Sequence, residues 1–202
     1  MKKRISLFIN ILIIILEIIG FIISYKTNNY IAIQFYTEDS NILALVICTI
    51  FSIYLIFNKQ IPKWLSILKY ASTICLTLTF LVIILILAPM FNFNYVGMLF
   101  KGTMLYHHFL CPILAIITFI FFDNLGNIEK DYTIKGLYLT FIYAIVLIIL
   151  NIIDIVEGPY PFLMVKKQSI LASIIWFIII IGLAYFISYM LRELYNKFNR
   201  RR

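Results

Sequence analysis

The chain has 202 residues, of which 63% are hydrophobic and only 13% are charged. A soluble domain of this length needs more polar surface, so the composition excludes an ordinary soluble protein and predicts apolar surface facing lipid. The formal net charge of +8 does not indicate nucleic-acid binding, because the basic residues flank apolar runs, where they meet lipid head groups. We expect one domain over residues 1–202.

The chain holds six apolar runs, at residues 5–24, 40–58, 70–91, 104–123, 135–154 and 169–191. A helix rises about 1.5 Å per residue, so roughly 20 apolar residues cross the hydrocarbon core. Helices also satisfy their own backbone hydrogen bonds, which lipid requires. The sequence therefore predicts an all-α fold, a polytopic bundle of six transmembrane helices.

Basic residues alternate between the connections. Thirteen lie on one side, in four groups: Lys2, Lys3 and Arg4; Lys59, Lys63 and Lys69; Lys130 and Lys135; Arg192, Lys197 and Arg200 to Arg202. Four lie on the other side: Lys26, Lys101, Lys166 and Lys167. Positively charged connections stay in the cytoplasm, so we expect both termini inside. The high Ile, Asn and Lys content indicates an AT-rich bacterial genome, and hence a bacterial plasma membrane.

The three cysteines, Cys48, Cys75 and Cys111, all lie inside apolar runs. An odd number at such positions predicts reduced, buried thiols, and no pair has the spacing of metal ligands. We expect no metal site and no cofactor.

The second predicted helix is preceded by polar residues from Thr37 to Asn41, at its outer end. One interpretation is a helix N-cap, in which Thr37, Asp39, Ser40 or Asn41 accepts hydrogen bonds from free backbone N–H groups and the acidic residues suit the helix dipole. The alternative interpretation is a functional site.

The fourth predicted helix carries His107 and His108 about one turn from its outer end, before Pro112. Proline cannot donate to the carbonyl of His108, so a free carbonyl and a kink are expected. Neighbouring helical positions point about 100° apart, so at most one imidazole points to the bundle axis. Deeper in the membrane, Glu17 of the first helix is expected to be protonated or directed into the bundle.

The fifth predicted helix ends with Asn151 and Asp154, which share a helical face. Asp154 either supports a histidine or a cation, or forms an interfacial ion pair with Lys166 or Lys167. The following Tyr160-Pro161-Phe162-Leu163 segment is a rigid connection, because proline holds the residue before it extended. It serves either as a fixed turn or as a lid over an outward-facing cavity.

Three of these segments resemble motifs of the androgen-induced family of six-helix membrane hydrolases and of its bacterial relatives. They are Phe35-Tyr36-Thr37 with Ser40-Asn41, the histidines before Pro112-Ile113-Leu114, and Tyr160-Pro161-Phe162-Leu163. Their order and approximate spacing agree along most of the chain. The eukaryotic members hydrolyse fatty acid esters of hydroxy fatty acids.

The resemblance implies that Thr37 is the nucleophile and that a histidine takes its proton. The eukaryotic spacing before Pro112 selects His107, and the spacing expected of bacterial relatives selects His108, which we favour. Ser40, Asn41, Asp154, Tyr160 and Phe162 would bind the substrate or support the site. A neutral imidazole near its usual pKa of about 6.5 suits this chemistry.

We therefore expect an intramembrane hydrolase of lipid or fatty-acyl esters, with membrane lipids or a fatty-acyl substrate as partners and no nucleic acid. One alternative is a non-enzymatic binder or transporter of a lipid or small amphiphile that uses the same cluster. Another is a structural subunit, whose polar residues only cap and pack helices and which has no cavity there. The sequence does not predict an oligomeric state.

Overall fold

The computed structural model describes residues 1–28 and 33–199, and its elements there are helical, which confirms the all-α prediction. The first half comprises α1 (Lys2–Asn28), α2 (Tyr36–Ile56), α3 (Lys63–Val82), the π-helical stretch η1 (Ile83–Leu87) and α4 (Ala88–Met90). The middle comprises α5 (Tyr95–Phe100), π-helical η2 (Leu105–Leu110) and α6 (Cys111–Phe121). The rest comprises α7 (Tyr132–Lys135), α8 (Tyr138–Ile152), the 3-10 turns η3 (Pro161–Leu163) and η4 (Val165–Lys167), and α9 (Ile170–Asn199).

Five helices of the described chain are long and apolar enough to cross a membrane: Lys2–Thr27, Tyr36–Ile56, Lys63–Met90, Tyr132–Ile152 and Ile170–Asn199. They indicate a multi-pass membrane protein. The run predicted at 104–123 forms a shorter apolar helix, Leu105–Phe121. The short helices α5 and α7 were not predicted, because both contain too few residues to produce a recognisable apolar run.

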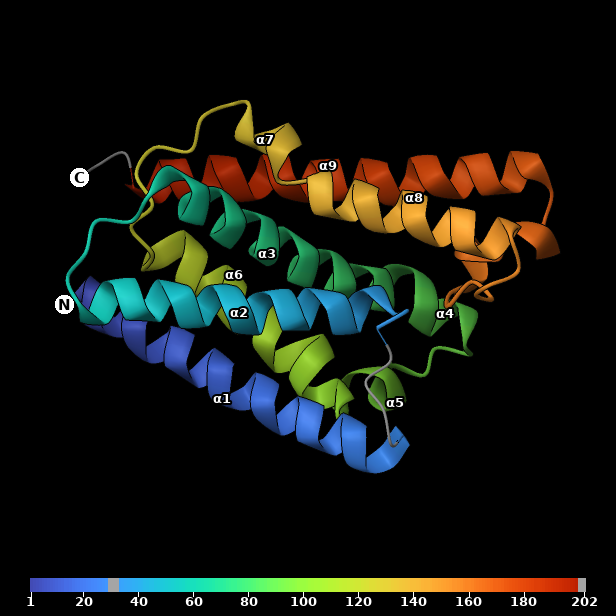
Figure 1. Cartoon of the computed structure of the whole chain (residues 1–202), viewed down its shortest axis with the longest axis horizontal. Helices are drawn as coiled ribbons and strands as arrows, with labels where there is room; N and C mark the ends of the chain where they lie inside the picture. The colour runs from blue at the N-terminus through green and yellow to red at the C-terminus, as the bar shows by residue number, and fades with distance from the viewer. Residues whose placement is uncertain (29–32, 200–202) are drawn as a thin grey trace.

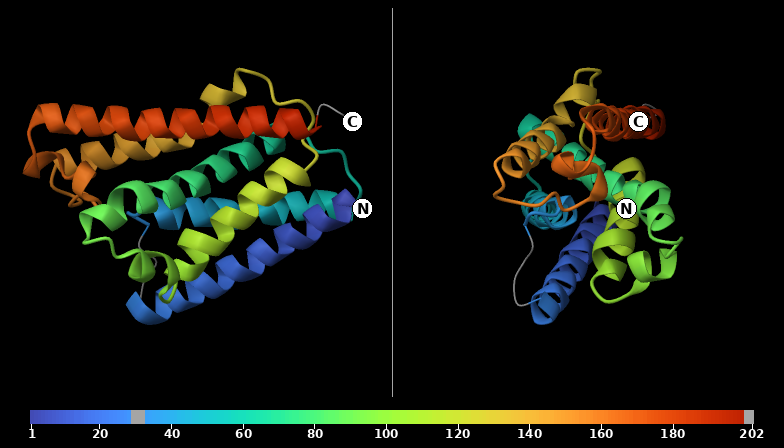
Figure 2. Two further views of the ribbon diagram at one scale, coloured as in Figure 1. Left: turned by 180° about the vertical axis from the view of Figure 1, so that it is seen from behind. Right: turned by 90° about the vertical axis from the view of Figure 1, so that its right-hand side faces the viewer.

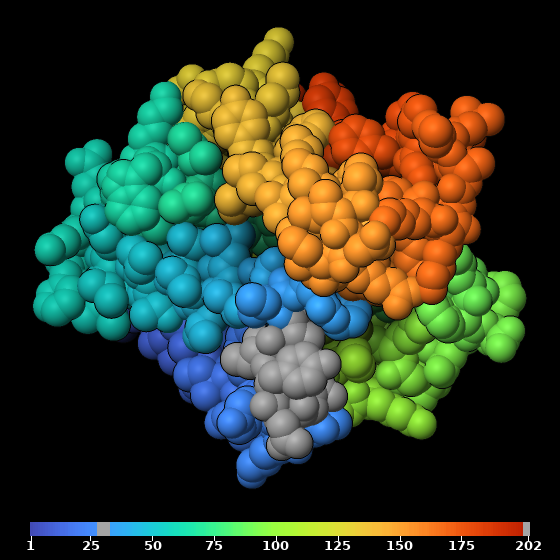
Figure 3. All heavy atoms as spheres, turned by 45° about the vertical axis from the view of Figure 1, so that its right-hand side comes forward, coloured from blue at the N-terminus to red at the C-terminus, as the bar shows by residue number. Residues whose placement is uncertain are grey.

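The long helices lie side by side along the longest axis of the molecule (Figures 1 and 2). Both termini lie at one end, which we call the terminal end, together with the α2–α3 and α6–α7 connections. The α4–α5 and α8–α9 connections lie at the other end, which we call the distal end. Figure 3 shows α8 and its following connection, in orange, covering the start of α2, in blue.

Helix α3 forms the centre of the bundle and packs against α2, α6 and α9. Every residue from Lys69 to Thr79 is buried. A larger apolar cluster includes Phe51, Tyr70, Phe119 and Tyr195, and a smaller one joins α1, α2, α3 and α6 around Ile13 and Leu76. The interior is therefore well packed on both sides of α3.

Helix α1 has the reverse of the polarity expected in a soluble protein. Its polar residues Ser6, Asn10, Glu17 and Ser24 are each at most 1% exposed. Its opposite face exposes large apolar side chains: Phe8, Ile11, Ile15, Ile18 and Ile22. In water this arrangement would expose a continuous apolar face, whereas a lipid environment accounts for it.

Candidate functional site

The start of α2 holds Thr37 at the distal end. The N-cap is Phe35, and its side chain makes no capping hydrogen bond. Ser40 and Asn41 do not cap the helix either, because both donate to the backbone carbonyl of Thr37, at 2.9 Å and 2.7 Å. The capping interpretation of these residues is therefore wrong, since their side chains bond to a carbonyl rather than to free N–H groups.

Tyr160 lies directly against Thr37. The Thr37 hydroxyl and the Tyr160 hydroxyl are 3.3 Å apart, and the backbone N–H of Thr37 donates to the same phenol oxygen at 3.3 Å. Phe162 stacks on the Tyr160 ring at a centroid distance of 5.2 Å, and Phe35 packs edge-on at 5.8 Å. Burial raises the pKa of Tyr160 to about 12, so its phenol stays neutral near neutral pH.

A small cavity of about 50 Å³ lies beside the Thr37–Tyr160 contact. Its lining is almost entirely apolar, and the hydroxyl-bearing residues Thr79, Thr140 and Tyr143 also border it. Two apolar grooves reach this cavity from the two sides of α8. One, of about 480 Å³, lies between α8 and α9 and shares Ala144 and Phe162 with the cavity. The other, of about 660 Å³, lies between α2 and α8 and shares Tyr36 and Tyr143 with it.

The two histidines occupy the π-helical stretch η2, and their rings point to different neighbours. His107 is 1% exposed and packs against Phe21 at a centroid distance of 4.6 Å. The Nδ1 atom of His108 is 2.7 Å from the backbone carbonyl of Met98, near the end of α5. A π-helical turn immediately before Pro112 accommodates the missing proline N–H, and such turns are frequent at functional sites.

Two carboxylates lie against the His107 ring. Its Nε2 is 3.5 Å from Glu17 Oε2, and its Nδ1 is 3.7 Å from Glu38 Oε1. The Thr103 hydroxyl is 3.4 Å from the same Nδ1. Both Glu17 oxygens are buried without a hydrogen-bond partner in the described chain. Glu17 is thus directed into the bundle, as expected, and its neighbour is His107.

Asn41 links the Thr37 and His107 segments. Its side-chain amide donates to the carbonyl of Thr37 at 2.7 Å and also lies 3.4 Å from the carbonyl of His107. Among the residues that the structure describes, however, neither imidazole hydrogen-bonds the Thr37 hydroxyl, and neither lines the cavity beside it. Thr37 and the histidines are therefore neighbours through their backbones, while their side chains have different surroundings.

Asp154 lies apart from this cluster. Its side chain is 78% exposed and forms an ion pair with Lys166 at 2.5 Å. Glu157 forms a similar pair with Lys167. Of the two roles expected for Asp154, the structure shows the interfacial ion pair.

A second polar cluster, near the terminal end, was missed. The Lys69 ammonium is 3.7 Å from Asp123 Oδ2, 2.7 Å from Asn10 Oδ1 and 3.2 Å from the Cys48 sulfur. The Ser6 hydroxyl donates to Asp123 at 2.5 Å.

The placement of Lys69 among the flanking charges was wrong. Lys69 lies inside α3 and is 1% exposed, because it pairs with Asp123 from the far end of α6. Four polar residues of α1 lie on one face of the helix, because they are separated by four, seven and seven positions: Ser6, Asn10, Glu17 and Ser24. That spacing was the available signal that this face is polar and buried.

Over residues 1–28 and 33–199, no group of three His, Cys, Asp or Glu side chains is arranged to hold a metal ion. No known protein family matches the chain, and neither the curated proteins nor the solved structures compared with it include a match.

Proposed function

We propose that this protein binds a membrane lipid, or a similar amphiphile with two apolar arms, with the polar centre of the ligand at Thr37 and Tyr160. The observation that carries the proposal is the meeting of two apolar grooves, one on each side of α8, at a small cavity that Thr37 and Tyr160 border. Apolar sites with a few convergent polar groups are typical of ligand binding.

The chemistry of the cavity favours a neutral polar linkage. Among the described residues, its lining is almost entirely apolar and includes no charged side chain, and its few polar residues carry hydroxyl groups, which suit an ester or alcohol oxygen better than a phosphate. Lys166, at the edge of the α8–α9 groove, is already paired with Asp154. We therefore expect an ester-linked or hydroxylated lipid.

The proposal includes six membrane spans in a bacterial plasma membrane, with both termini in the cytoplasm. Leu105–Phe121 would be the fourth span, because it runs obliquely along the bundle from the distal end toward the terminal end (Figure 2). An even number of crossings returns the chain to the side on which it began, so six crossings agree with the position of both termini at one end. The terminal end would then be cytoplasmic, by the excess of basic residues there.

Tryptophan fluorescence tests lipid binding, because Trp176 lines the α8–α9 groove. In a Trp64→Phe background Trp176 is the only tryptophan. A long-chain ester with a brominated acyl arm should quench its emission at saturable concentrations. Ala144→Phe, which fills the junction of the groove and the cavity, should weaken this quenching, whereas Ile178→Phe on the exposed face of α9 should not.

Non-saturable quenching, equal in the Ala144→Phe variant, would instead reflect bromolipid dissolved in the surrounding detergent or bilayer. That result would refute the binding site.

A second candidate function is ester hydrolysis, favoured by the position of the Thr37 hydroxyl on the cavity. The Thr37 oxygen would attack the acyl carbonyl, the alcohol would leave with a proton, and water would release the acid. Tyr160 is suited to donate a hydrogen bond and not to act as the base, since its pKa is about 12. The base would be His107 or His108, and it must first move into reach of Thr37.

Purified protein incubated with a panel of acyl esters tests this step. We expect hydrolysis by the unmodified protein, none by Thr37→Ala and some by Thr37→Ser, while Trp176 quenching stays saturable in both variants even where the affinity falls. Saturable quenching without turnover of any ester would leave the protein as a non-enzymatic lipid binder.

A further inference from the structure

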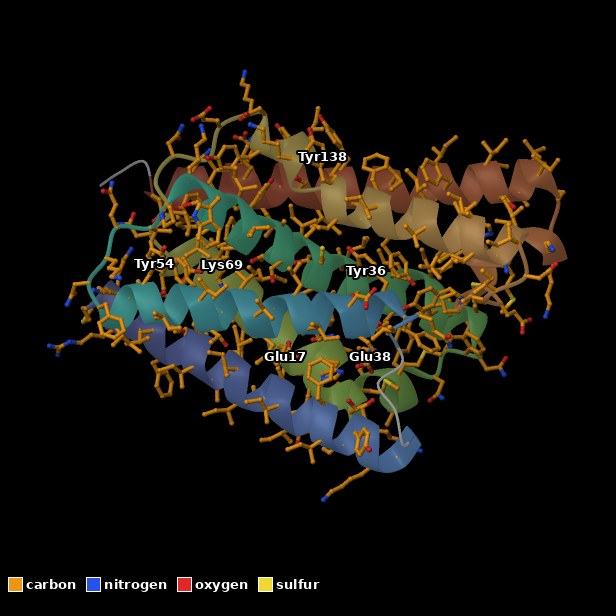
Figure 4. The ribbon with its side chains drawn as sticks, viewed as in Figure 1. Glu17, Tyr36, Glu38, Tyr54, Lys69 and Tyr138 are labelled. Atoms are coloured by element: carbon orange, nitrogen blue, oxygen red, sulfur yellow. The ribbon has the colours of Figure 1, made fainter. Side chains whose placement is uncertain are left out.

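Several buried ionisable groups of the bundle form a column, and apart from His107 none of them has a role in the proposed lipid binding or hydrolysis. Figure 4 labels three of its members, Glu38, Glu17 and Lys69, which follow one another from the distal toward the terminal end. Each is at most 8% exposed. Ionisable residues at membrane depth are costly, and chains of Asp, Glu and His are the usual components of proton pathways.

The distal part of the column consists of Glu38, His107 and Glu17. Glu38 lies nearest the distal end of the three, and its side chain is mostly buried, with 8% of the residue exposed (Figure 4). The imidazole lies between the two carboxylates, with 3.7 Å on its Nδ1 side and 3.5 Å on its Nε2 side. A neutral imidazole accepts a proton on one nitrogen and releases one from the other, so the ring can transfer a proton from Glu38 to Glu17.

Buried polar atoms without partners converge on this part of the column. Five buried atoms here lack hydrogen-bond partners within the described residues: the two Glu17 carboxylate oxygens, Glu38 Oε2, His107 Nε2 and the neighbouring Asn41 Oδ1. Buried polar atoms in proteins are almost always satisfied, so five in one region need an explanation. Protons or single water molecules shared among these atoms would satisfy them.

The middle of the column contains two thiols. Cys111 lies beside the Glu17 carboxyl, and Cys48 interacts electrostatically with Cys111, Glu17 and Lys69. Ile13 and Leu76 pack around both thiols. This segment is the least polar part of the column, and the Cys111 thiol is its polar neighbour of Glu17.

The terminal part leads from Lys69 to the surface. The ammonium contacts Cys48 at 3.2 Å and faces Asp123 at 3.7 Å, and Asp123 accepts from Ser6 at 2.5 Å. Ser6 lines a cavity of about 850 Å³ that opens between the start of α1 and the α6–α7 connection. The column therefore reaches a surface opening at the terminal end.

We propose that this column conducts protons across the membrane: through Glu38, His107 and Glu17 at the distal end, past Cys111 and Cys48, and through Lys69, Asp123 and Ser6 at the terminal end. At each step one group loses a proton and the next gains it. One proton enters from the distal side and one leaves at the terminal side, with no change in oxidation state. The other titratable groups that face the distal part are Asp39, which interacts with Glu38, and His108, beside His107.

Proteoliposomes that contain the full chain and the internal pH indicator pyranine test the proposal without the brominated ester or any added ester substrate. A potassium gradient with valinomycin makes the vesicle interior negative, and the initial rate of internal acidification is measured. The unmodified protein should acidify the interior faster than protein-free vesicles do. Glu17→Gln should reduce the rate to that of protein-free vesicles, whereas Glu157→Gln, in the exposed pair with Lys167, should leave it unchanged.

Two substitutions of similar size test the thiol segment. Cys111→Ser keeps a group that can donate and accept a proton and should retain flux, whereas Cys111→Val should lose it. Variants are compared only after gel filtration and thermal unfolding show intact protein. Flux of the unmodified protein no faster than that of protein-free vesicles, undiminished flux in Glu17→Gln, or equal flux in the two Cys111 variants would each overturn the proposal.

Failure of this assay would not bear on the lipid site, since Trp176 quenching measures that site separately.

Discussion

Gly20 determines how closely α1 approaches the His107 ring. A Cβ atom at Gly20 would lie 2.3 Å from His107 Nε2 and 2.6 Å from its Cδ2. The ring is also fixed by Phe21, Glu17 and Thr103, so it has no open direction in which to withdraw. A glycine is therefore required here for a specific packing reason.

We expect Gly20→Ala to destabilise the protein although alanine favours helix. The gain in helix propensity is about 1 kcal/mol, whereas overpacking a buried site costs about 1–3 kcal/mol. Thermal unfolding in detergent measures the net effect. Gly182→Ala is the matched control, because nothing lies within 4 Å of a Cβ atom built there, and it should be neutral or stabilising. Equal effects of the two substitutions would show that the close approach is absent.

Tyr160 offers a second test at this scale. Tyr160→Phe removes the phenol oxygen that contacts the Thr37 hydroxyl and N–H but keeps the ring stacked on Phe162. Loss of one hydrogen bond from the phenol to the ligand, worth about 1 kcal/mol, predicts a roughly fivefold higher Kd for the brominated ester, measured by Trp176 quenching. Tyr185→Phe, at a half-exposed position on α9, should leave the affinity unchanged. A Tyr160→Phe variant with full affinity would exclude the phenol from the ligand site.

At the scale of helices, the Lys69–Asp123 pair holds α3 to the end of α6 and, through Asn10 and Ser6, to α1. Removing one partner of a buried pair leaves the other charge uncompensated. We expect Lys69→Met or Asp123→Asn alone to cost about 3–5 kcal/mol of unfolding free energy. The double variant should cost clearly less than the sum of the single variants, because the two side chains are coupled.

Unfolding curves of all four proteins in one detergent provide this measurement. If the two single effects add up in the double variant, the two side chains do not interact as a pair.

The long helices could be predicted from the sequence because apolar length alone determines them. Their ends were less predictable. The second helix was expected from residue 40 but begins at Tyr36, which places Thr37 and Glu38 in its first turn. The last was expected to end at 191 but continues to Asn199, because Tyr195 and Asn196 bury their side chains against Leu125 and Ile128.

The candidate site was less predictable than the fold. The Thr37–Tyr160 neighbourhood followed the expected gathering of polar segments at one end, since both lie at the same depth. The pairing of His107 with Glu17 and Glu38 depends on the rotation of three helices about their axes, which apolar length does not determine. The burial of Lys69 was missed for the same reason, as its partner Asp123 lies 54 positions away in the sequence.

At the scale of the whole molecule, the proposed functions require the two ends of the bundle to face opposite sides of a membrane. The three native cysteines are free and buried, so they should not react with a membrane-impermeant maleimide. New cysteines at exposed connections therefore report orientation. Two substitutions introduce a cysteine at the terminal end: Lys59→Cys and Asn127→Cys. The distal pair consists of Lys101→Cys and Asp154→Cys.

In intact cells we expect labelling of the distal pair only, and of all four after permeabilisation. The reason is the excess of basic residues at the terminal end, which keeps those connections in the cytoplasm. The four cysteine positions distinguish two ways in which the proposed topology could be wrong. The reverse pattern would invert the orientation and place the lipid grooves near the inner leaflet. Labelling of Lys101→Cys and Asn127→Cys without Asp154→Cys would mean that Leu105–Phe121 fails to cross, because Asp154 follows the next span. In that second case the column from Glu38 to Ser6 would not connect the two sides, because α6 carries Cys111 and precedes Asp123 directly.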